Sequence, residues 1–224
     1  MVLPIPGVLN PAQIEEVQRL LAEAPFRDGK YSAGREARPV KENEEMVQED
    51  TRYARLNEIV MRALVNHPLF QQAALPLRVA SPFYARYRPG MQYGDHVDDP
   101  VMGPITGRYR SDVSTTVFLN APEDYAGGEL VIRTSYGEAR FKGEAGSAVV
   151  YPSHSLHRVA PVTEGERLVA VTWTQSLVRD AARRELLFEL GQARDALLEK
   201  APRDEATARV SHSYVNLLRM WAEL

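Results

Sequence analysis

The chain of 224 residues is 44% apolar and 25% charged, an ordinary globular composition that allows one main domain with a helical appendage but not two full domains. Its formal net charge of -3 gives no basic footprint for a nucleic-acid partner, so none is expected. The chain has no cysteine, which excludes disulfides, thiolate metal sites and iron–sulfur clusters and leaves nitrogen and oxygen atoms as the metal ligands.

The first residues of the chain contain neither the basic segment nor the apolar segment of a secretory signal. No apolar run approaches the roughly 20 residues that a membrane-spanning helix needs. We therefore expect a cytoplasmic location and no membrane partner.

Two amphipathic helices are predicted before the β-rich part of the chain. The first starts at Asn10 and Pro11, because an asparagine side chain can cap a helix and proline is favoured in the first turn. The second is expected over about Gln48 to Asn66, where apolar residues recur at helical spacing. Residues 29–49 are polar and charged without a clear period, and we interpret them as a loop or as a strand with a long excursion. Residues 1–76 are expected to form a helical support that is integral to the fold.

A series of short β-rich runs follows over residues 77–177, separated by turn residues such as Pro89-Gly90 and Gly127-Gly128. The runs are Leu77–Arg88, Tyr93–Asp98, Val113–Asn120, Leu130–Thr134, Ala139–Lys142, Ala148–Tyr151, His157–Val162 and Leu168–Thr174. Many short strands without intervening helices are typical of a sandwich or barrel and not of a parallel βαβ sheet. We expect this segment to be the core domain of an α+β protein.

Helical periodicity returns after Ser176 and forms two apolar stripes, which Ala201-Pro202 separates. Residues 178–224 are therefore predicted to form a helical hairpin. We interpret the hairpin as a packing element, and the alternative is a homodimer surface or a substrate lid.

The histidines are few enough to weigh one by one. The chain has five, and three of them, His96, His154 and His157, fall in the β-rich part. His96 and Asp98 form a His-x-Asp, whose side chains project from the same face of an extended chain and can reach one metal ion. This triplet is a weak signal by itself. His157 starts a later run and supplies a second imidazole, whereas His154 is interpreted as a loop residue near the pocket mouth or as a substrate contact.

Two histidines and one carboxylate form the facial triad of non-haem Fe(II) oxygenases, which leaves open positions for a bidentate co-substrate and for O₂. Arg167 lies across a predicted turn from His157. Strand residues rise about 3.3 Å each, so this guanidinium can reach the far end of a dicarboxylate co-substrate and pair with its carboxylate. The pattern predicts an iron site at His96, Asp98 and His157, with Arg167 as the carboxylate clamp.

Further motifs surround these residues. They are His96-Val97-Asp98, Gly127-Gly128-Glu129-Leu130, Tyr151-Pro152-Ser153, Leu156-His157-Arg158-Val159-Ala160-Pro161-Val162 and Gly165-Glu166-Arg167. Together they resemble the PKHD-type hydroxylases, bacterial relatives of the prolyl 4-hydroxylases among the Fe(II)/2-oxoglutarate oxygenases, and the resemblance covers nearly the whole chain. It implies a double-stranded β-helix, a jelly roll of the cupin kind, with Fe(II) at His96, Asp98 and His157 and 2-oxoglutarate at Arg167. It further implies O₂ and L-ascorbate as co-reactants and a link to bacterial iron uptake.

Phe118 departs from the pattern of the prolyl-hydroxylase relatives, many of which place there a tyrosine whose hydroxyl assists the distal carboxylate. Phenylalanine cannot donate a hydrogen bond, and Thr116 or Tyr84 are the candidates for that role. Tyr84 and Tyr87 are candidates for the co-substrate pocket, although core packing explains Tyr87 and Tyr93 equally well. The surrounding arginines hint at an anionic substrate, unless they form a solvated face: Arg86, Arg88, Arg108 and Arg110.

The expected activity is hydroxylation of an amino acid, a peptidyl side chain or another small molecule, with decarboxylation of 2-oxoglutarate to succinate. The alternative is a non-catalytic barrel that binds or senses iron or a small molecule. A hydrolytic or isomerising cupin with zinc or manganese is a weaker third candidate. Arg167 favours the oxygenase, because neither alternative needs a carboxylate clamp at that distance.

Overall fold

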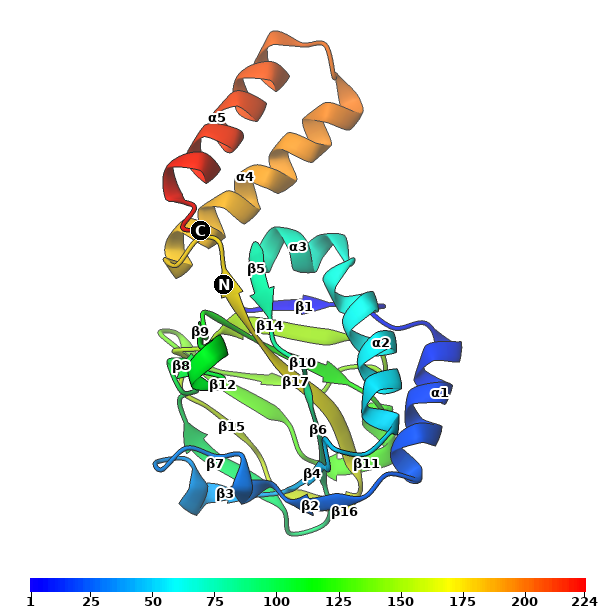
Figure 1. Ribbon diagram of the computed structural model, residues 1–224. Coiled ribbons are helices and arrows are strands. Elements are labelled where there is room, and N and C mark those ends of the chain that lie inside the picture. The colour runs from blue at the N-terminus through cyan, green and yellow to red at the C-terminus, as the bar shows by residue number, and fades with distance from the viewer.

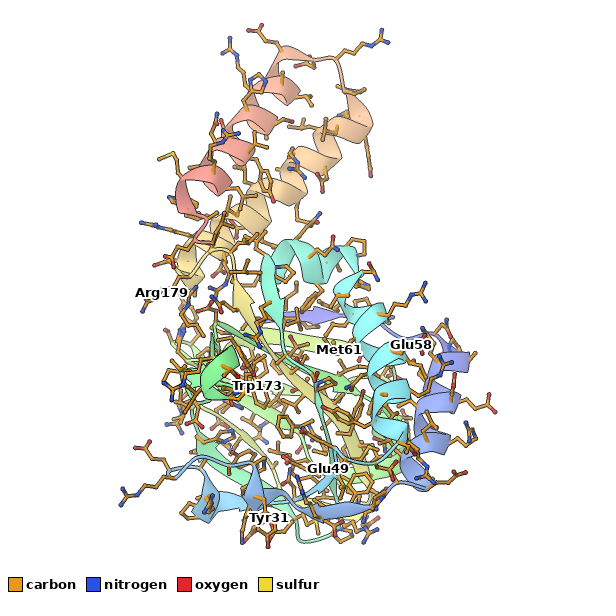
Figure 2. The ribbon with its side chains drawn as sticks, viewed as in Figure 1. Tyr31, Glu49, Glu58, Met61, Trp173 and Arg179 are labelled. Carbon is orange, nitrogen blue, oxygen red and sulfur yellow. The ribbon has the colours of Figure 1, made fainter.

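The computed structural model describes the whole chain, residues 1–224. Two antiparallel sheets form its body, helices cover one side of that body, and a helical hairpin projects from it (Figure 1). Figure 2 shows that side chains fill the space between the sheets, whereas those of the hairpin point largely into solvent.

The larger sheet has eight strands in the order β1-β14-β10-β17-β6-β4-β2, and β5 pairs with β17 beside this path. Their bounds are β1 Leu3–Ile5, β2 Phe26–Asp28, β4 Glu44–Met46, β5 Pro76–Val79, β6 Phe83–Tyr87, β10 Val113–Phe118, β14 Ala148–Pro152 and β17 Arg167–Ser176. The smaller sheet has five strands in the order β13-β12-β15-β7-β3. Their bounds are β3 Lys41–Glu42, β7 Gln92–His96, β12 Leu130–Thr134, β13 Gly137–Phe141 and β15 His157–Val159.

The two sheets enclose an apolar cluster to which both contribute. Leu130 and Ile132 of the smaller sheet meet Val149 and Val169 of the larger one. Two short ribbons complete the strands: β11 (Tyr125–Gly127) with β16 (Val162–Gly165), and β8 (Val101–Met102) with β9 (Tyr109–Arg110). The prediction of a jelly-roll β core is confirmed.

Three N-terminal helices pack on the outer face of the larger sheet, as Figure 1 shows for α1 and α2. They are α1 (Pro11–Ala22), α2 (Arg52–Val65) and α3 (Pro68–Ala74). The predicted start of α1 is confirmed, since the Asn10 side chain accepts from the backbone N–H of Gln13 in a capping box. The second helix begins later than the predicted Gln48, because the Asp50 carboxylate accepts from the backbone N–H of Arg52. Helix α3 was not predicted from the sequence.

The polar segment at 29–49 has more order than its sequence indicates. It holds the 3₁₀ turns η1 (Gly29–Tyr31) and η2 (Arg38–Val40), then β3 and β4. Strand β3 pairs with β7 of the smaller sheet, and β4 pairs with β6 of the larger one. The chain therefore passes from one sheet to the other at residues 41–46 and forms part of the wall between them. The remaining 3₁₀ turns are η3 (Ile105–Gly107) and η4 (Pro122–Asp124).

The predicted C-terminal hairpin is present as α4 (Ala181–Lys200) and α5 (Glu205–Trp221). A small apolar cluster of Leu75, Val178, Leu187 and Tyr214 joins its base to the body. Arg184 is buried at this joint and donates to the carbonyl oxygens of three residues: Asp112, Val178 and Arg179. A role of the hairpin in dimerisation stays a prediction. None of the helices is both long and apolar enough to span a lipid bilayer.

Candidate metal centre and co-substrate cavity

Three side chains converge between the sheets. The Nε2 atoms of His96 and His157 each lie 3.9 Å from Oδ1 of Asp98, and one ligand atom from each residue falls within 4.8 Å of the others. His96 and His157 are direct neighbours across β7 and β15, so the sheet register sets the pair of imidazoles. Strand β7 ends at His96, and Asp98 reaches the same point from the loop that follows. Two imidazole nitrogens and one carboxylate oxygen are a donor set that fits Fe(II).

Backbone carbonyls fix the orientation of both imidazoles. Nδ1 of His96 lies 2.8 Å from the carbonyl oxygen of Gly94, and Nδ1 of His157 lies 3.0 Å from that of Ser155. A carbonyl only accepts, so each Nδ1 carries the proton and each Nε2 lone pair faces Asp98. Burial, and next the neighbouring His157, lower the pKa of His96 to about 4. His96 is therefore neutral at neutral pH and ready to bind a metal.

A chain of hydroxyls holds the carboxylate of Asp98. Ser114 Oγ donates to Asp98 Oδ2, and the hydroxyl oxygens of Ser114 and Ser153 lie 2.8 Å apart. A hydroxyl has one hydrogen, so Ser153 can donate to Ser114 while Ser114 donates to the carboxylate. Both serines are buried. This contact occupies Oδ2 and leaves Oδ1 free to bind a metal ion. Nothing in the sequence indicated Ser114, and Ser153 was noted only as part of the Tyr151-Pro152-Ser153 motif, without a role.

Two aromatic rings brace the imidazoles. Tyr93 stacks on His96 with ring centroids 3.7 Å apart, and Tyr151 meets His157 edge-on at 5.1 Å. Asp95 lies on the outer face of the sheet and pairs with Arg158, as strand alternation predicts.

One cavity of about 430 Å³ extends from these residues between the sheets. Its lining includes the triad, Arg167, and Trp173, which is labelled in Figure 2. Arg167 is 1% exposed, and its Nε and Nη1 atoms have no hydrogen-bond partner. A buried guanidinium without an acceptor is costly, so these donors fit the far carboxylate of a bound dicarboxylate.

The Gly127-Gly128 motif makes room for Arg167 as well as for a turn. Both glycines have positive φ, and a Cβ on Gly128 would lie 3.1 Å from Cδ of Arg167. A side chain at 128 would crowd the stem of the buried arginine.

Two tyrosine hydroxyls neighbour the guanidinium of Arg167. Burial raises the pKa of Tyr87 to about 12 against the opposing effect of Arg167, whose guanidinium carbon lies 4.9 Å from the Tyr87 ring centroid. Burial likewise raises the pKa of Tyr125, and Arg167 again opposes it. Sequence reasoning missed Tyr125, although its position two residues before Gly127 was a usable signal. Tyr87 and Tyr125 thus place hydroxyl groups beside Arg167, whereas Phe118 supplies none.

The structure places Tyr84 outside the cavity, against expectation. Tyr84 packs in the outer core and its hydroxyl donates to Asn57 Oδ1, because residues 84 and 87 of one strand face opposite sides. Thr116 does line the cavity. His154 is exposed and belongs to neither the cavity lining nor the cluster of metal-ligand atoms.

The four arginines suggested for an anionic substrate do not line the cavity either. Arg86 pairs with Glu44, Arg88 pairs with Glu166, and Arg110 pairs with Asp112. Asp99 also lines the cavity, because β7 ends at His96 and the alternation of strand side chains stops there.

Comparison with known proteins gives the class first. Residues 82–175 match the family model of the 2OG-Fe(II) oxygenase superfamily, and residues 180–223 match the PKHD-type hydroxylase C-terminal domain. The chain is therefore an Fe(II)- and 2-oxoglutarate-dependent oxygenase. It is 58% identical to a PKHD-type hydroxylase of Thioalkalivibrio sulfidiphilus and 46% identical to one of Gloeothece citriformis, each over 100% of both chains. The chain belongs to the PKHD-type hydroxylase family.

Solved structures share the fold. A prolyl hydroxylase from Trichoplax adhaerens, in complex with a hypoxia inducible factor peptide fragment, has a TM-score of 0.59 at 16% identity and covers 83% of this chain and 86% of its own. The viral collagen prolyl hydroxylase of Paramecium bursaria Chlorella virus-1 has a TM-score of 0.53 at 19% identity and covers 78% of this chain and 95% of its own. These matches confirm the double-stranded β-helix.

Proposed function

We propose that His96, Asp98 and His157 hold Fe(II), that Arg167 anchors 2-oxoglutarate, and that the protein hydroxylates an amino-acid, peptidyl or other small substrate. The observation that carries the proposal is a buried guanidinium whose Nε and Nη1 have no hydrogen-bond partner, in the same cavity as a two-histidine, one-carboxylate cluster. The reaction consumes O₂, 2-oxoglutarate and substrate, and yields succinate, CO₂ and the hydroxylated product. Fe(II) bound at the triad supplies the redox chemistry that couples decarboxylation to hydroxylation.

The protein's own part is orientation and exclusion of water. Arg167 pairs with the far carboxylate of 2-oxoglutarate and turns its keto-acid end towards the triad. The hydroxyl of Tyr87, which stays protonated at neutral pH, is the second donor at that end. Ser114 keeps Asp98 from rotating. Phe83 and Val171 give the cavity an apolar wall that limits water near the reacting atoms.

Several finer assignments belong to the same proposal. L-ascorbate as an auxiliary reductant and a link to bacterial iron uptake rest on the family resemblance alone. We also propose a cytoplasmic location, and a division into a support at 1–76, an oxygenase core at 77–177 and a helical subdomain at 178–224. A homodimer through the C-terminal helices is proposed because both helices expose apolar side chains, including Leu186 and Met220.

Succinate release tests the proposal. The Fe(II)-loaded wild-type protein should convert 2-oxoglutarate to succinate slowly under O₂ without added substrate, because oxygenases of this type turn over their co-substrate uncoupled. His157→Ala should abolish both iron retention and succinate, whereas the matched change His154→Ala should alter neither. Iron retention without any succinate in the wild type would instead support the non-catalytic barrel. Loss of iron in His154→Ala with retention in His157→Ala would refute the ligand assignment.

A further inference from the structure

A row of three polar side chains lines the cavity beside the metal centre. Lys41, Asn43 and Glu45 alternate along the segment that passes from β3 to β4, and all three are buried and belong to the cavity lining. Side chains two residues apart in extended chain share a face, which explains why all three point to the same side. The proposed binding of Fe(II) and 2-oxoglutarate uses none of them.

Lys41 and Glu45 form an ion pair inside the cavity wall. Their side chains are only 7% and 10% exposed, and Lys41 Nζ contacts Glu45 Oε1. Removing two charges from water costs about as much as their attraction returns, so such a pair is weak support for stability. Its position in a substrate-sized cavity therefore points to recognition.

Each member of the ion pair still has an atom that can form a hydrogen bond with a ligand. Lys41 Nζ donates to Ser32 Oγ at 2.8 Å and to Glu45, which uses two of its three hydrogens. Glu45 Oε2 accepts no hydrogen bond from the protein. One ammonium hydrogen and one carboxylate oxygen thus remain for a ligand.

Asn43 adds an unsatisfied amide to the same row. Its Oδ1 is buried without a partner, and a Cβ on Gly29 would lie 1.9 Å from that atom. Gly29 therefore leaves the space in which the Asn43 side chain sits. A buried amide oxygen without a donor is costly. Rotation of the Asn43 side-chain amide would allow a ligand N–H to donate to its Oδ1.

The row lies close to the reacting centre. Lys41 Nζ is 5.3 Å from the ring centroid of Tyr93, and that ring stacks on His96. One aromatic ring, that of Tyr93, thus contacts a proposed iron ligand and lies within 5.3 Å of the Lys41 ammonium.

We infer that the substrate of the proposed reaction is a free α-amino acid, whose carboxylate binds Lys41 and whose ammonium group binds Glu45, with Asn43 as a further polar contact. This inference rests on the proposed function. A ligand with a single negative charge is repelled by Glu45, and one with a single positive charge is repelled by Lys41, so the fixed pair selects a zwitterion. The cavity of about 430 Å³ must also admit 2-oxoglutarate, which favours a compact substrate.

The first test uses the wild-type protein loaded with Fe(II) and 2-oxoglutarate, to which each standard L-α-amino acid is added singly. At least one amino acid should raise O₂-dependent succinate release about tenfold or more above the uncoupled rate. Its N-acetyl derivative and its carboxamide, which lose one charge each, should not. No stimulation by any amino acid, or equal stimulation by these derivatives or by a peptide containing that residue, would overturn the inference.

The second test measures binding without turnover, by equilibrium dialysis of the radiolabelled amino acid against the anaerobic protein with Fe(II) and 2-oxoglutarate. Lys41→Met and Glu45→Gln should each raise its Kd about tenfold or more. The double variant removes both charges, so it leaves no unpaired ion in the wall and should keep the wild-type circular dichroism while failing to bind. Glu44→Gln is the matched control, because Glu44 lies on the same strand outside the cavity lining and pairs with Arg86.

The two hypotheses fail differently. Wild-type amino-acid affinity in the folded double variant would refute the role of the ion pair while leaving uncoupled succinate release intact. Absence of succinate release in the iron-loaded protein would instead refute the proposed function. Dialysis of each radiolabelled standard amino acid in turn would then still decide whether the row binds a zwitterion.

Discussion

The hydroxyl of Ser114 offers a test of how the proposed iron site is held. Ser114 is fully buried on β10 and donates to Oδ2 of Asp98, whose other oxygen faces both histidines. Ser114→Ala removes this donor and adds no bulk. The carboxylate then loses the contact that fixes its rotation, although all three proposed ligands remain.

The Ser114→Ala substitution should reduce both the affinity for Fe(II) and the stability of the fold. Partners that orient a metal ligand typically contribute about 10–100-fold in metal affinity, which corresponds to roughly 1.4–2.8 kcal/mol. A buried charged acceptor that loses its donor also costs the fold about 1–3 kcal/mol. In a chain of this size the second loss lowers Tm by about 2–4 °C for each kcal/mol.

The assay is anaerobic titration of the apoprotein with Fe(II) against a competing chelator, together with thermal unfolding. Thr115→Val is the matched control, because Thr115 is equally buried on the same strand and its hydroxyl has no partner. Ser114→Ala should weaken Fe(II) binding about 10–100-fold, whereas the control should match the wild type. An Fe(II) Kd within about twofold of the wild type in Ser114→Ala would show that Asp98 needs no such support.

Three further outcomes are expected. Tyr87→Phe should raise the Kd for 2-oxoglutarate about 3–10-fold, as loss of one hydrogen bond predicts, with unchanged iron binding; calorimetric titration of the anaerobic protein checks this. Because burial raises the pKa of Tyr87 to about 12, its contribution to stability is fully present below about pH 10 and is lost as the pH rises towards 12. Urea unfolding at about pH 9 and about pH 11 should show that loss, and a smaller one in Tyr87→Phe. Arg184→Met should lower the free energy of unfolding by about 2–5 kcal/mol, since three hydrogen bonds to carbonyl oxygens disappear, two of them buried. It should also speed proteolysis at the base of the hairpin, and an unchanged Tm and cleavage rate would contradict this.

Strands and helices were predictable where local signals agree. Asn10 followed by Pro11 places the start of α1, and apolar runs bounded by turn residues mark most strands of both sheets. The three candidate metal ligands could be predicted from the sequence for the same reason. His96 and Asp98 are sequence neighbours, and His157 opens another strand of the same sheet.

Features that depend on tertiary packing could not be predicted from the sequence. Lys41, Asn43 and Glu45 lie in a polar stretch, and their burial arises only because β3 and β4 join different sheets. In the sequence Ser114 does not differ from other strand residues, and its role becomes clear only from its hydrogen bond to Asp98 in the folded structure. The misplacement of Tyr84 is different, since strand alternation alone separates it from Tyr87. That error was avoidable from the sequence.

The central claim is that one cavity holds Fe(II) at the triad and 2-oxoglutarate at Arg167. Titration of the anaerobic Fe(II) protein with 2-oxoglutarate, followed through the metal-to-ligand charge-transfer absorption, tests it most directly. Arg167→Met keeps similar bulk without the guanidinium, and loss of a buried charge-assisted pair should cost about 2–5 kcal/mol, or tens-fold to thousands-fold in Kd. Arg167→Lys should recover part of the loss, since a point charge cannot reproduce two parallel hydrogen bonds. The account predicts a charge-transfer band in the wild type and a Kd raised at least about tenfold in Arg167→Met at unchanged Fe(II) affinity. A wild-type Kd in Arg167→Met, with undiminished succinate release, would show that 2-oxoglutarate is held elsewhere.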